Sequence, residues 1–470
     1  MRNLGLTDTI AAMGTGLGEA GIGIVRISGK DALKIADRVF VAKGGKKPSG
    51  FKAYTVHYGW IVERNQKPVA RNQKLKIIDE VLLTVMRKPK SYTKEDVVEI
   101  NCHGGIMAMR AVSDLVLENG ARLAEPGEFT KRAFLNGRID LAQAEAVLDI
   151  IRAKTDSALK IGTEQLRGTL SNQINRLRKG LLDALAILEA NIDFPEEEIG
   201  VLNLKEAFKK LNAVNGALKG ILVSSKHGKV LRDGIQAVIC GKPNVGKSSL
   251  LNALLKQERS IVSSISGTTR DTIEEIIDIK GIPVRIVDTA GIIEPRDLVE
   301  KKAVSRSKRH IGFADLVILL FDGSQKLTKD DEALIKKLRK KQIIAIINKI
   351  DLRQKIDKIK IEEIFKHVIG LSAKKLQNIG LLEEAIADLV FGGKVIKSES
   401  ALVSNLRHIE LLKEAENFID SALKSLDNKV SVEFVAQDIK GALGSFDTVS
   451  GKNFSEDLLE KIFSEFCIGK

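Results

Sequence analysis

The sequence predicts a multidomain protein that combines an α+β domain, a helical domain and an inserted α/β domain. The chain has 470 residues, which is enough for roughly three domains. Strand-like runs alternate with helical periodicity in residues 231–393, as is typical of an α/β domain. Amphipathic helical segments flank that part on both sides, and strands mixed with glycine-rich turns precede them.

Residues 1–125 have the pattern of an α+β domain. Residues 21–28 and 79–86 are rich in β-branched and aliphatic side chains and are expected to form strands. A glycine-rich stretch at residues 14–18 precedes the first of them and is expected to be a turn. Residues 126–230, in contrast, are predicted to be helical, because apolar residues recur there at helical spacing.

Helical spacing returns after the α/β part. It is present in residues 406–415 and again in residues 455–463, so residues 394–470 are predicted to be a second helical part. Both flanks of the α/β part are therefore helical and amphipathic. The simplest arrangement inserts residues 231–393 into a helical domain, because insertion at a surface loop with close termini disturbs the host domain little.

A phosphate-binding loop lies at the start of the α/β part. Residues 241–248 are G-K-P-N-V-G-K-S, with a β-type run before them and a helical pattern after them. The glycines allow successive backbone N–H groups to turn toward a phosphate, and the helix N-terminus adds positive charge. Lys247 is expected to reach the β- and γ-phosphates, and the Ser248 hydroxyl to bind Mg²⁺.

Two further motifs follow in the order that a nucleotide switch requires. Residues 267–271 are G-T-T-R-D, where the Thr269 hydroxyl is expected to add to the Mg²⁺ site. Residues 288–291 are D-T-A-G after a strand-like run. Asp288 is expected to hold the metal through water, and the Gly291 N–H to contact the γ-phosphate, a contact that hydrolysis removes.

The last two motifs indicate guanine. In residues 348–351, N-K-I-D, the Asp351 carboxylate can accept both N–H donors of the guanine edge, which adenine lacks. Residues 371–374, L-S-A-K, offer backbone donors to the guanine carbonyl. Each string alone is weak evidence, but all five in order predict a GTP site. The residues assigned to it are Gly241, Asn244, Val245, Gly246, Lys247, Ser248, Ser249, Thr268, Thr269, Asp288, Thr289, Ala290, Gly291, Asn348, Lys349, Asp351, Ser372, Ala373 and Lys374.

One departure concerns hydrolysis. Ras-like GTPases have a glutamine after the D-x-x-G motif that orients the attacking water. Here Ile292 and Ile293 follow, which cannot do this. Asn244 could hold a monovalent cation beside the phosphates, and Glu300 could orient the water. Taken alone, each of these two is more often an ordinary loop or helix-surface residue.

The composition of the chain limits the kinds of binding partner and the cellular compartment to be expected. The formal charge of +14 favours a polyanionic partner, whereas 4% aromatic residues argue against reading single-stranded bases by stacking. The densest basic run, residues 336–341, is interpreted as a solvated helix face. Three scattered cysteines form no disulfide framework or zinc pattern, which suits a reducing cytoplasm. The apolar runs are too short to cross a membrane, and the first residues have no signal-peptide core, so membrane insertion is not expected.

Several strings outside the GTP motifs resemble the MnmE (TrmE) family of tRNA-modifying GTPases over essentially the whole chain. The N-terminal strings and the terminal Cys-Ile-Gly-Lys are specific to that family, whereas the GTP motifs are shared with many GTPases. The matching strings are residues 8–12, 21–29, 91–99, 103–105, 126–143, 193–197 and 466–470. The resemblance implies an N-terminal tetrahydrofolate-binding and dimerisation domain in residues 1–125 and an inserted Ras-like GTPase domain.

The resemblance also implies site residues beyond the nucleotide motifs. Arg26, Glu99, Arg138 and Lys470 would bind 5-formyltetrahydrofolate or a related one-carbon folate. Arginine suits the glutamate tail of a folate and a carboxylate suits the pterin N–H donors. Without the resemblance, Arg26 and Glu99 would be interpreted as a strand-surface ion pair. Cys467 is a candidate for the modification chemistry, although a lone terminal cysteine is more often inert.

For the GTPase domain the resemblance implies potassium activation. A potassium ion would be held by Asn244 and by the loop residues Ser263, Ile265 and Thr268, Glu300 would orient water, and Lys247 would act on the phosphates. The resemblance further implies a homodimer and an FAD-dependent partner, MnmG (GidA). Together they would add an aminomethyl-type group, commonly carboxymethylaminomethyl, at C5 of the wobble uridine of certain tRNAs.

Two other functions stay open at this point. A ribosome-assembly GTPase of the Era or Der type would share the nucleotide motifs. After the first nucleotide domain such a protein would also carry a second one, or an RNA-binding domain with a G-x-x-G loop, and neither domain is recognised in the sequence. The other alternative is a folate-binding regulatory GTPase without a role in tRNA modification.

Overall fold

The computed structural model describes most of the chain. The described residues are 7–16, 18–63, 76–193, 200–257, 274–288, 312–339, 341–392 and 403–470. Contacts divide the chain into two compact units, Met1–Leu148 with Asp447–Lys470 and Asp149–Phe446. The boundaries predicted at residues 125, 230 and 393 rest on where strand and helix patterns change in the sequence. Residue 230 lies within the helix Gly200–Asp233, and residue 393 lies outside the described residues. The contacts instead group residues 126–148 and the last helix with the N-terminal sheet.

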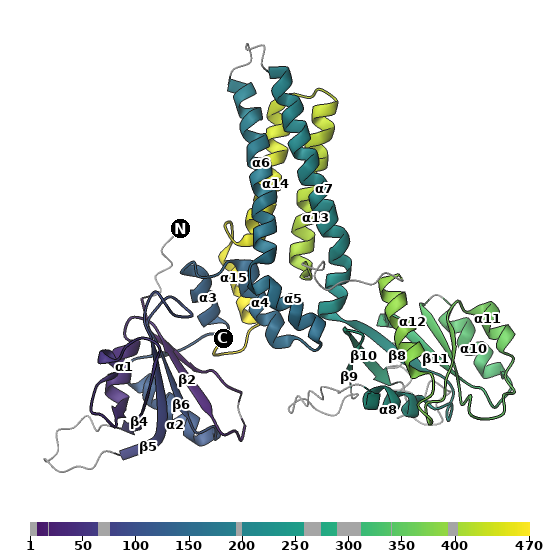
Figure 1. Ribbon diagram of the computed structural model, residues 1–470, viewed down its shortest axis with the longest axis horizontal. Coiled ribbons are helices and arrows are strands. Elements are labelled where there is room, and N and C mark those ends of the chain that lie inside the picture. The colour runs from purple at the N-terminus through teal and green to yellow at the C-terminus, as the bar shows by residue number, and fades with distance from the viewer. Residues whose placement is uncertain are drawn as a thin grey trace. The chain divides into compact units, whose positions relative to one another are not determined.

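The first unit is built on a seven-stranded sheet with the order β3-β4-β5-β6-β2-β1-β7. Its strands are β1 (Ile10–Met13), β2 (Gly23–Ser28), β3 (Phe40–Ala42), β4 (Thr55–Glu63), β5 (Lys76–Met86), β6 (Val97–Cys102) and β7 (Arg122–Leu123). One face packs on α1 (Ala32–Val39) and α2 (Ile106–Glu118), as Figure 1 shows. Alternation along the strands explains this core, because Val25 and Ile27 point to the helices whereas Arg26 points away.

The other face of this sheet is covered only in part. Phe129 of α3 (Glu128–Leu135) packs against Ile10 and Ala12 of β1. Toward β4 and β5 the same face stays exposed, with Val56, Tyr58 and Leu82 at its surface. The helices α3, α4 (Leu141–Arg152) and α15 (Glu456–Ser464) form a small core of their own, in which Phe134, Leu141 and Phe463 are buried.

The second unit has a helical part. Its helices are α5 (Asp156–Leu166), α6 (Thr169–Asp193), α7 (Gly200–Asp233), α13 (Leu406–Asp427) and α14 (Val432–Ser450), of which residues 447–450 group with the first unit. Figure 1 shows α6, α7, α13 and α14 side by side, and α7 contacts both α6 and α13. Since α7 precedes the α/β part and α13 follows it, the predicted insertion of that part between two helical flanks is confirmed. Within the described residues no helix is both long enough and apolar enough to cross a membrane.

The inserted part is a six-stranded sheet with the order β13-β12-β11-β8-β10-β9. Its strands are β8 (Ile235–Cys240), β9 (Glu274–Ile279), β10 (Ile282–Asp288), β11 (Leu316–Asp322), β12 (Ile343–Asn348) and β13 (Val368–Gly370). All neighbours run parallel except β9, which pairs antiparallel with β10. The carboxyl ends of the parallel strands therefore meet at one edge, which is where ligands bind in such sheets.

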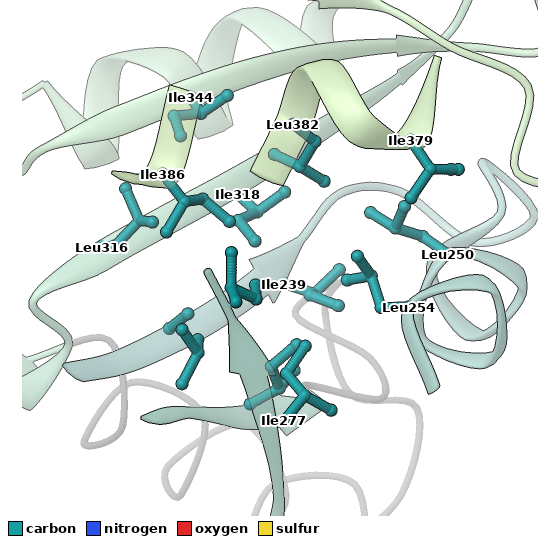
Figure 2. Packing of buried hydrophobic residues seen from close by; sticks show 14 of the residues in the cluster. Ile239, Leu250, Leu254, Ile277, Leu316, Ile318, Ile344, Ile379, Leu382 and Ile386 are labelled. Carbon is teal, nitrogen blue, oxygen red and sulfur yellow. The ribbon is translucent and has the colours of Figure 1, made fainter. Parts of the chain in front are cut away.

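Helices cover both faces of this sheet. One face carries α8 (Lys247–Gln257) and α12 (Ile379–Phe391), and the other carries α10 (Lys329–Leu338) and α11 (Lys358–Ile364). Figure 2 shows Leu250 and Leu254 of α8 and Leu382 and Ile386 of α12 packing toward the strand residue Ile318. Burial on both faces explains why β11 is an unbroken apolar run up to its last residue.

Candidate functional site

The phosphate-binding loop connects β8 to α8 at the carboxyl edge of the sheet. Both of its glycines are required by the backbone geometry, because Gly241 has φ +148° and Gly246 has φ +103°. A Cβ on Gly246 would lie 2.2 Å from Nδ2 of Asn348. The ammonium of Lys247 donates to the carbonyl oxygens of Gly241 at 3.0 Å and Lys242 at 2.8 Å, so it lies against the loop backbone.

Asn348 joins the three described nucleotide motifs. Its side-chain Nδ2 donates to the Val245 carbonyl at 2.7 Å, and its Oδ1 accepts from the backbone N–H of Lys349 at 2.8 Å and of Ala373 at 3.0 Å. The residue is 2% exposed. A buried amide with its hydrogen bonds satisfied holds one geometry, so Asn348 fixes the phosphate loop against the guanine motifs.

Asp322 is a site residue that the sequence did not predict. It ends β11, and its Oδ2 lies 2.6 Å from Nζ of Lys349, which also donates to the Asn244 carbonyl at 2.9 Å. Burial alone would raise the pKa of Asp322, but hydrogen bonds from Lys349 and Ser324 lower it below its usual range. The signal that could have found Asp322 is its position, because it ends a buried strand at the ligand-binding edge.

Asp351 follows Lys349 by two residues, and its side chain is exposed to solvent. A hydrogen bond from the Ser372 side chain lowers the pKa of Asp351, and the charges of Lys375 and Lys374 act in the same direction. The carboxylate is therefore held in its ionised form, which is the form that accepts two N–H donors.

An open cavity of about 530 Å³ brings these residues together. It is lined by Asn244, Gly246, Lys247, Ser248, Ser249, Asn348, Lys349, Asp351, Leu352, Ser372 and Lys374. Val245 and Ala373 are buried beneath it and reach the site through their backbone. The two ends of the cavity thus hold the phosphate motif and the guanine motif.

Other expected site residues lie outside the described residues: Ser263, Ile265, Thr268, Thr269, Thr289, Ala290, Gly291 and Glu300. Asp288 is described only by its backbone, which ends β10. It pairs in register with Ile239 of β8, so it lies beside the strand that leads into the phosphate-binding loop.

The residues predicted to bind folate all lie in the first unit, and two of them, Arg26 and Glu99, lie on its partly covered sheet face. Arg26 of β2 and Glu99 of β6 are direct neighbours across the sheet, and Nε of Arg26 lies 2.7 Å from Oε1 of Glu99. Their side chains are 19% and 21% exposed, so both remain accessible to a ligand. The guanidinium carbon of Arg26 also lies 5.5 Å from the centroid of the Phe129 ring.

The C-terminal tail contacts the same part of the sheet face, beside Arg26 and Phe129. Nη1 of Arg26 donates to the Gly469 carbonyl at 3.2 Å, and the Phe129 N–H donates to the Lys470 carbonyl at 3.2 Å. Gly469 has φ +93°, and a Cβ there would lie 2.2 Å from the Met13 carbonyl oxygen. Cys467 is exposed, and its carbonyl accepts from the Gly127 N–H at 3.4 Å.

Arg138 is connected to Arg26 and Phe129 through Tyr92. Its guanidinium carbon lies 4.7 Å from the centroid of the Tyr92 ring, and Tyr92 packs against the cluster that contains Phe129. The Tyr92 hydroxyl forms a hydrogen bond of 3.0 Å with Thr130. A chain of contacts therefore runs from Arg138 through α3 to Arg26.

A doubly covered parallel sheet with a phosphate-binding loop and an Asn-Lys-x-Asp motif at its carboxyl edge defines a P-loop protein of the guanine-nucleotide class. Two protein families match the chain. The MnmE helical domain matches residues 141–467, and the "GTP-binding protein TrmE N-terminus" matches residues 9–138. The chain belongs to the MnmE (TrmE) family of tRNA modification GTPases.

Curated relatives match it along its full length. The "tRNA modification GTPase MnmE" of Alkaliphilus oremlandii is 44% identical over 99% of this chain and 100% of its own. The protein of the same name from Carboxydothermus hydrogenoformans is 46% identical over the same shares.

Solved structures align with parts of the chain. Era of Aquifex aeolicus bound to GDP·AlF4− is 28% identical over 39% of this chain and 66% of its own, with a TM-score of 0.26. The G domain of the T. maritima FeoB iron transporter is 26% identical over 33% of this chain and 97% of its own, with a TM-score of 0.27.

Proposed function

We propose that this protein binds GTP in the cavity at the carboxyl edge of the inserted sheet, hydrolyses it, and acts in the modification of tRNA. Family membership makes it a GTP-hydrolysing enzyme of tRNA modification. The observation that carries the GTP site is the set of hydrogen bonds through which Asn348 joins the phosphate loop to both guanine motifs.

The residues around that cavity fit a guanine nucleotide with Mg²⁺. Gly246 lacks the Cβ that would collide with Asn348, so the loop backbone can curve around phosphates. Lys247 would exchange its bonds to the loop carbonyl oxygens for bonds to the β- and γ-phosphates. Ser248, Thr269 and Asp288 would hold Mg²⁺, which would neutralise phosphate charge. Asp351 would accept from the guanine N–H donors.

Hydrolysis is proposed to depend on K⁺ and on Glu300. Ile292 and Ile293 stand where Ras-like GTPases place their water-orienting glutamine, so another group is needed. Asn244 lines the phosphate end of the cavity, and with Ser263, Ile265 and Thr268 it would hold a potassium ion that supplies the charge of an arginine finger. Glu300 would orient the attacking water.

The Glu300→Ala variant tests this role. We expect GTP hydrolysis to fall about 100-fold or more while GTP affinity changes little, because a water-orienting group acts on the chemical step and not on binding. Single-turnover hydrolysis and nucleotide titration, each in K⁺ and in Na⁺, measure the two quantities. Equal losses of affinity and rate would instead assign Glu300 a binding or folding role.

The first unit is proposed to bind a one-carbon tetrahydrofolate, such as 5-formyltetrahydrofolate. Arg26 and Glu99 form one ion pair, partly exposed beside the C-terminal tail, so both would meet the same part of the folate. Glu99 suits the pterin N–H donors, and Arg26 would hold the Glu99 carboxylate in place. Arg138 and Lys470 would complete the site, and Cys467 would serve the modification chemistry from its exposed position. A bound folate would supply or activate the one-carbon unit.

The proposed partners follow from the family. The protein would act in the cytoplasm as a homodimer, together with an FAD-dependent MnmG (GidA) subunit. The exposed Val56, Tyr58 and Leu82 on β4 and β5 suit a second copy of this sheet face. The product would be an aminomethyl-type group, commonly carboxymethylaminomethyl, at C5 of the wobble uridine of certain tRNAs.

Mass spectrometry of digested tRNA tests the proposed function. Nucleosides from cells with and without the gene are compared, and the deletion is complemented with the wild-type chain. Loss of a C5-modified uridine in the deletion, restored by complementation, is the expected result. Unchanged nucleosides would contradict the role in tRNA modification. The remaining interpretation would then be a folate-binding regulatory GTPase.

A further inference from the structure

The α/β domain has another open cavity, at the amino-terminal edge of its sheet. Its volume is about 770 Å³, and its lining includes Gln342 and Ile343 at the start of β12 and His367 just before β13. The nucleotide motif N-K-I-D follows the opposite end of β12. The two cavities therefore lie at opposite edges of the same sheet, and both can be occupied together.

This cavity, which we call the basic groove, has an apolar floor and a basic rim. The floor includes Ile335 of α10, Ile343 of β12 and Phe365, which follows α11. The rim carries the basic side chains of Lys336, Arg339, Lys341, Lys360 and Lys366, with Glu332 and Glu363 as the acidic ones. Positive charge is therefore in clear excess around a concave surface.

Three of these cations have no partner among the described residues. Lys360 pairs with Glu332 at 2.9 Å, and Lys341 donates to the carbonyl oxygens of Gly312 and Ala314. Lys336, Arg339 and Lys366 are exposed and make no hydrogen bond or ion pair within the described part of the chain. They repel one another across one groove, which an anionic ligand would relieve.

We infer that the basic groove binds the sugar–phosphate backbone of a structured RNA, and that in this protein the RNA is tRNA. The inference rests on the proposed function for the identity of the RNA. An RNA backbone carries a phosphate at every nucleotide, so it can contact Lys336, Arg339 and Lys366 together. The guanidinium of Arg339 can donate two hydrogen bonds to one phosphate.

Charge and composition favour RNA over an acidic protein as the occupant. The whole chain has a formal charge of +14, which steers a polyanion toward it. The low aromatic content suits contacts to phosphates, which need no base stacking. The groove lies away from the GTP cavity, so it contributes to holding RNA while the nucleotide site turns over.

The test uses the full-length chain with Arg339→Glu and Lys366→Glu combined, and purified bulk tRNA as the probe. The dissociation constant is measured at several KCl concentrations. We expect affinity to fall about tenfold or more at low salt, and the slope of log affinity against log salt to become shallower by about 2, because two phosphate contacts are lost. GTP affinity and GTP hydrolysis without tRNA are expected to stay as in the wild type.

A matched control changes the same charge elsewhere on the domain. Lys256→Glu with Lys355→Glu serves as this control. Lys256 lies in the last turn of α8 on the opposite face of the sheet, and the backbone N–H of Lys355 donates to the Gly323 carbonyl at the nucleotide edge. Both side chains are exposed. The control is expected to keep the wild-type salt slope. Unaltered GTP binding and thermal unfolding show that each variant is folded.

Two outcomes overturn the inference in different ways. If the groove variant and the control have the same tRNA affinity and the same salt slope, the groove is not the RNA site. If the groove variant then also binds a partner protein more weakly, the groove is a site for an acidic protein surface. Absence of tRNA binding by the wild-type chain would overturn both this inference and the expectation that the protein itself contacts tRNA. In that case the mass spectrometry of tRNA nucleosides from cells with and without the gene still tests whether the protein acts in tRNA modification.

Discussion

Single polar side chains at strand ends hold the nucleotide cavity together. Asn348 ends β12 and Asp322 ends β11, and these neighbouring strands are in parallel register at Asp322 and Asn348. The register therefore places an amide and a carboxylate side by side. The amide binds the phosphate loop, and the carboxylate binds Lys349, so the loop and the guanine motif have one relative position.

The Asp351→Asn variant tests the guanine assignment. We expect the nucleotide preference to shift from GTP to XTP, and GTP affinity to fall about 10- to 100-fold, because an amide cannot accept both guanine N–H donors. Competition between GTP and XTP for a fluorescent nucleotide measures the shift. Asp388→Asn, at an exposed position of α12, is the control and should keep the GTP preference. Retained GTP preference in Asp351→Asn would show that the guanine edge binds elsewhere.

The Asp322→Ala variant tests the residue that the sequence did not reveal. Removing the carboxylate frees Lys349 from its 2.6 Å contact and leaves it with the Asn244 carbonyl alone. We expect GDP and GTP affinity to fall about tenfold, because the guanine motif is no longer fixed beside the phosphate loop. Nucleotide titration measures this. Asp322→Asn retains the shape and an acceptor for Ser324, so a smaller loss is expected, and unchanged affinity in both variants would limit Asp322 to folding.

At the scale of elements, the C-terminal tail is seated by backbone contacts. Ile468 pairs with Pro126, and the carbonyl oxygens of Gly469 and Lys470 accept from Arg26 and Phe129. A tail this short has no core of its own. Its position depends on the fit of Gly469 against Met13, where no side chain has room.

The Gly469→Ala variant tests the link between the tail and the folate. The new Cβ would lie 2.2 Å from the Met13 carbonyl oxygen at a backbone φ of +93°, so the tail is expected to leave its seat. We expect the affinity for 5-formyltetrahydrofolate, measured by calorimetry, to fall about tenfold, with GTP affinity unchanged. Cys467→Ala changes only an exposed side chain and should bind folate normally. Unchanged folate affinity in Gly469→Ala would separate the tail from the folate site.

At the scale of the whole molecule, each unit has its own core. In the first unit a buried ion network joins the N-terminal residues to α3. The guanidinium of Arg132 is fully buried and lies 2.8 Å from Glu128, 2.7 Å from Asp8 and 3.2 Å from Glu95. Removing one partner of such a buried group is costly, because it leaves a charge without compensation.

This network makes the first unit sensitive to acid. Burial alone would raise the pKa of Glu128 and of Asp8, but hydrogen bonds from Arg122 and Arg132 lower both pKa values below the ordinary 4.5 and 3.8. Because the folded-state pKa values are the lower ones, their stabilisation is complete above about pH 5 and is lost as the pH falls through the folded-state values. The unfolding temperature of this unit is therefore expected to fall below pH 5.

Trp60, the single tryptophan, lies in β4 and reports on this unit by fluorescence. Glu128→Gln is expected to lower the free energy of unfolding at pH 7 by about 3 kcal/mol and to flatten its decline in acid. Glu118→Gln, at an exposed position in α2, is the control and should behave as the wild type. An unchanged acid profile in Glu128→Gln would show that other carboxyl groups cause the acid sensitivity.

Features that rest on contiguous residues can be predicted from the sequence. The phosphate-binding loop, the guanine motifs, the strands that lead into them and the insertion between helical flanks are all local patterns of spacing and hydrophobic period. Motif chemistry depends on neighbours in the chain, so it can be predicted without a structure. The basic run of residues 336–341 was equally visible, although its interpretation as a solvated face gave no reason to expect a groove beneath it.

Contacts between residues far apart in the chain follow from the tertiary structure. Asp322 contacts Lys349 because β11 and β12 lie in parallel register, and Arg26 contacts Gly469 because the tail crosses the first unit. Lys366 joins Lys336 and Arg339 at one groove because α10 and α11 cover the same face of the sheet. Such contacts depend on register and packing between segments far apart in the chain, which local patterns do not encode.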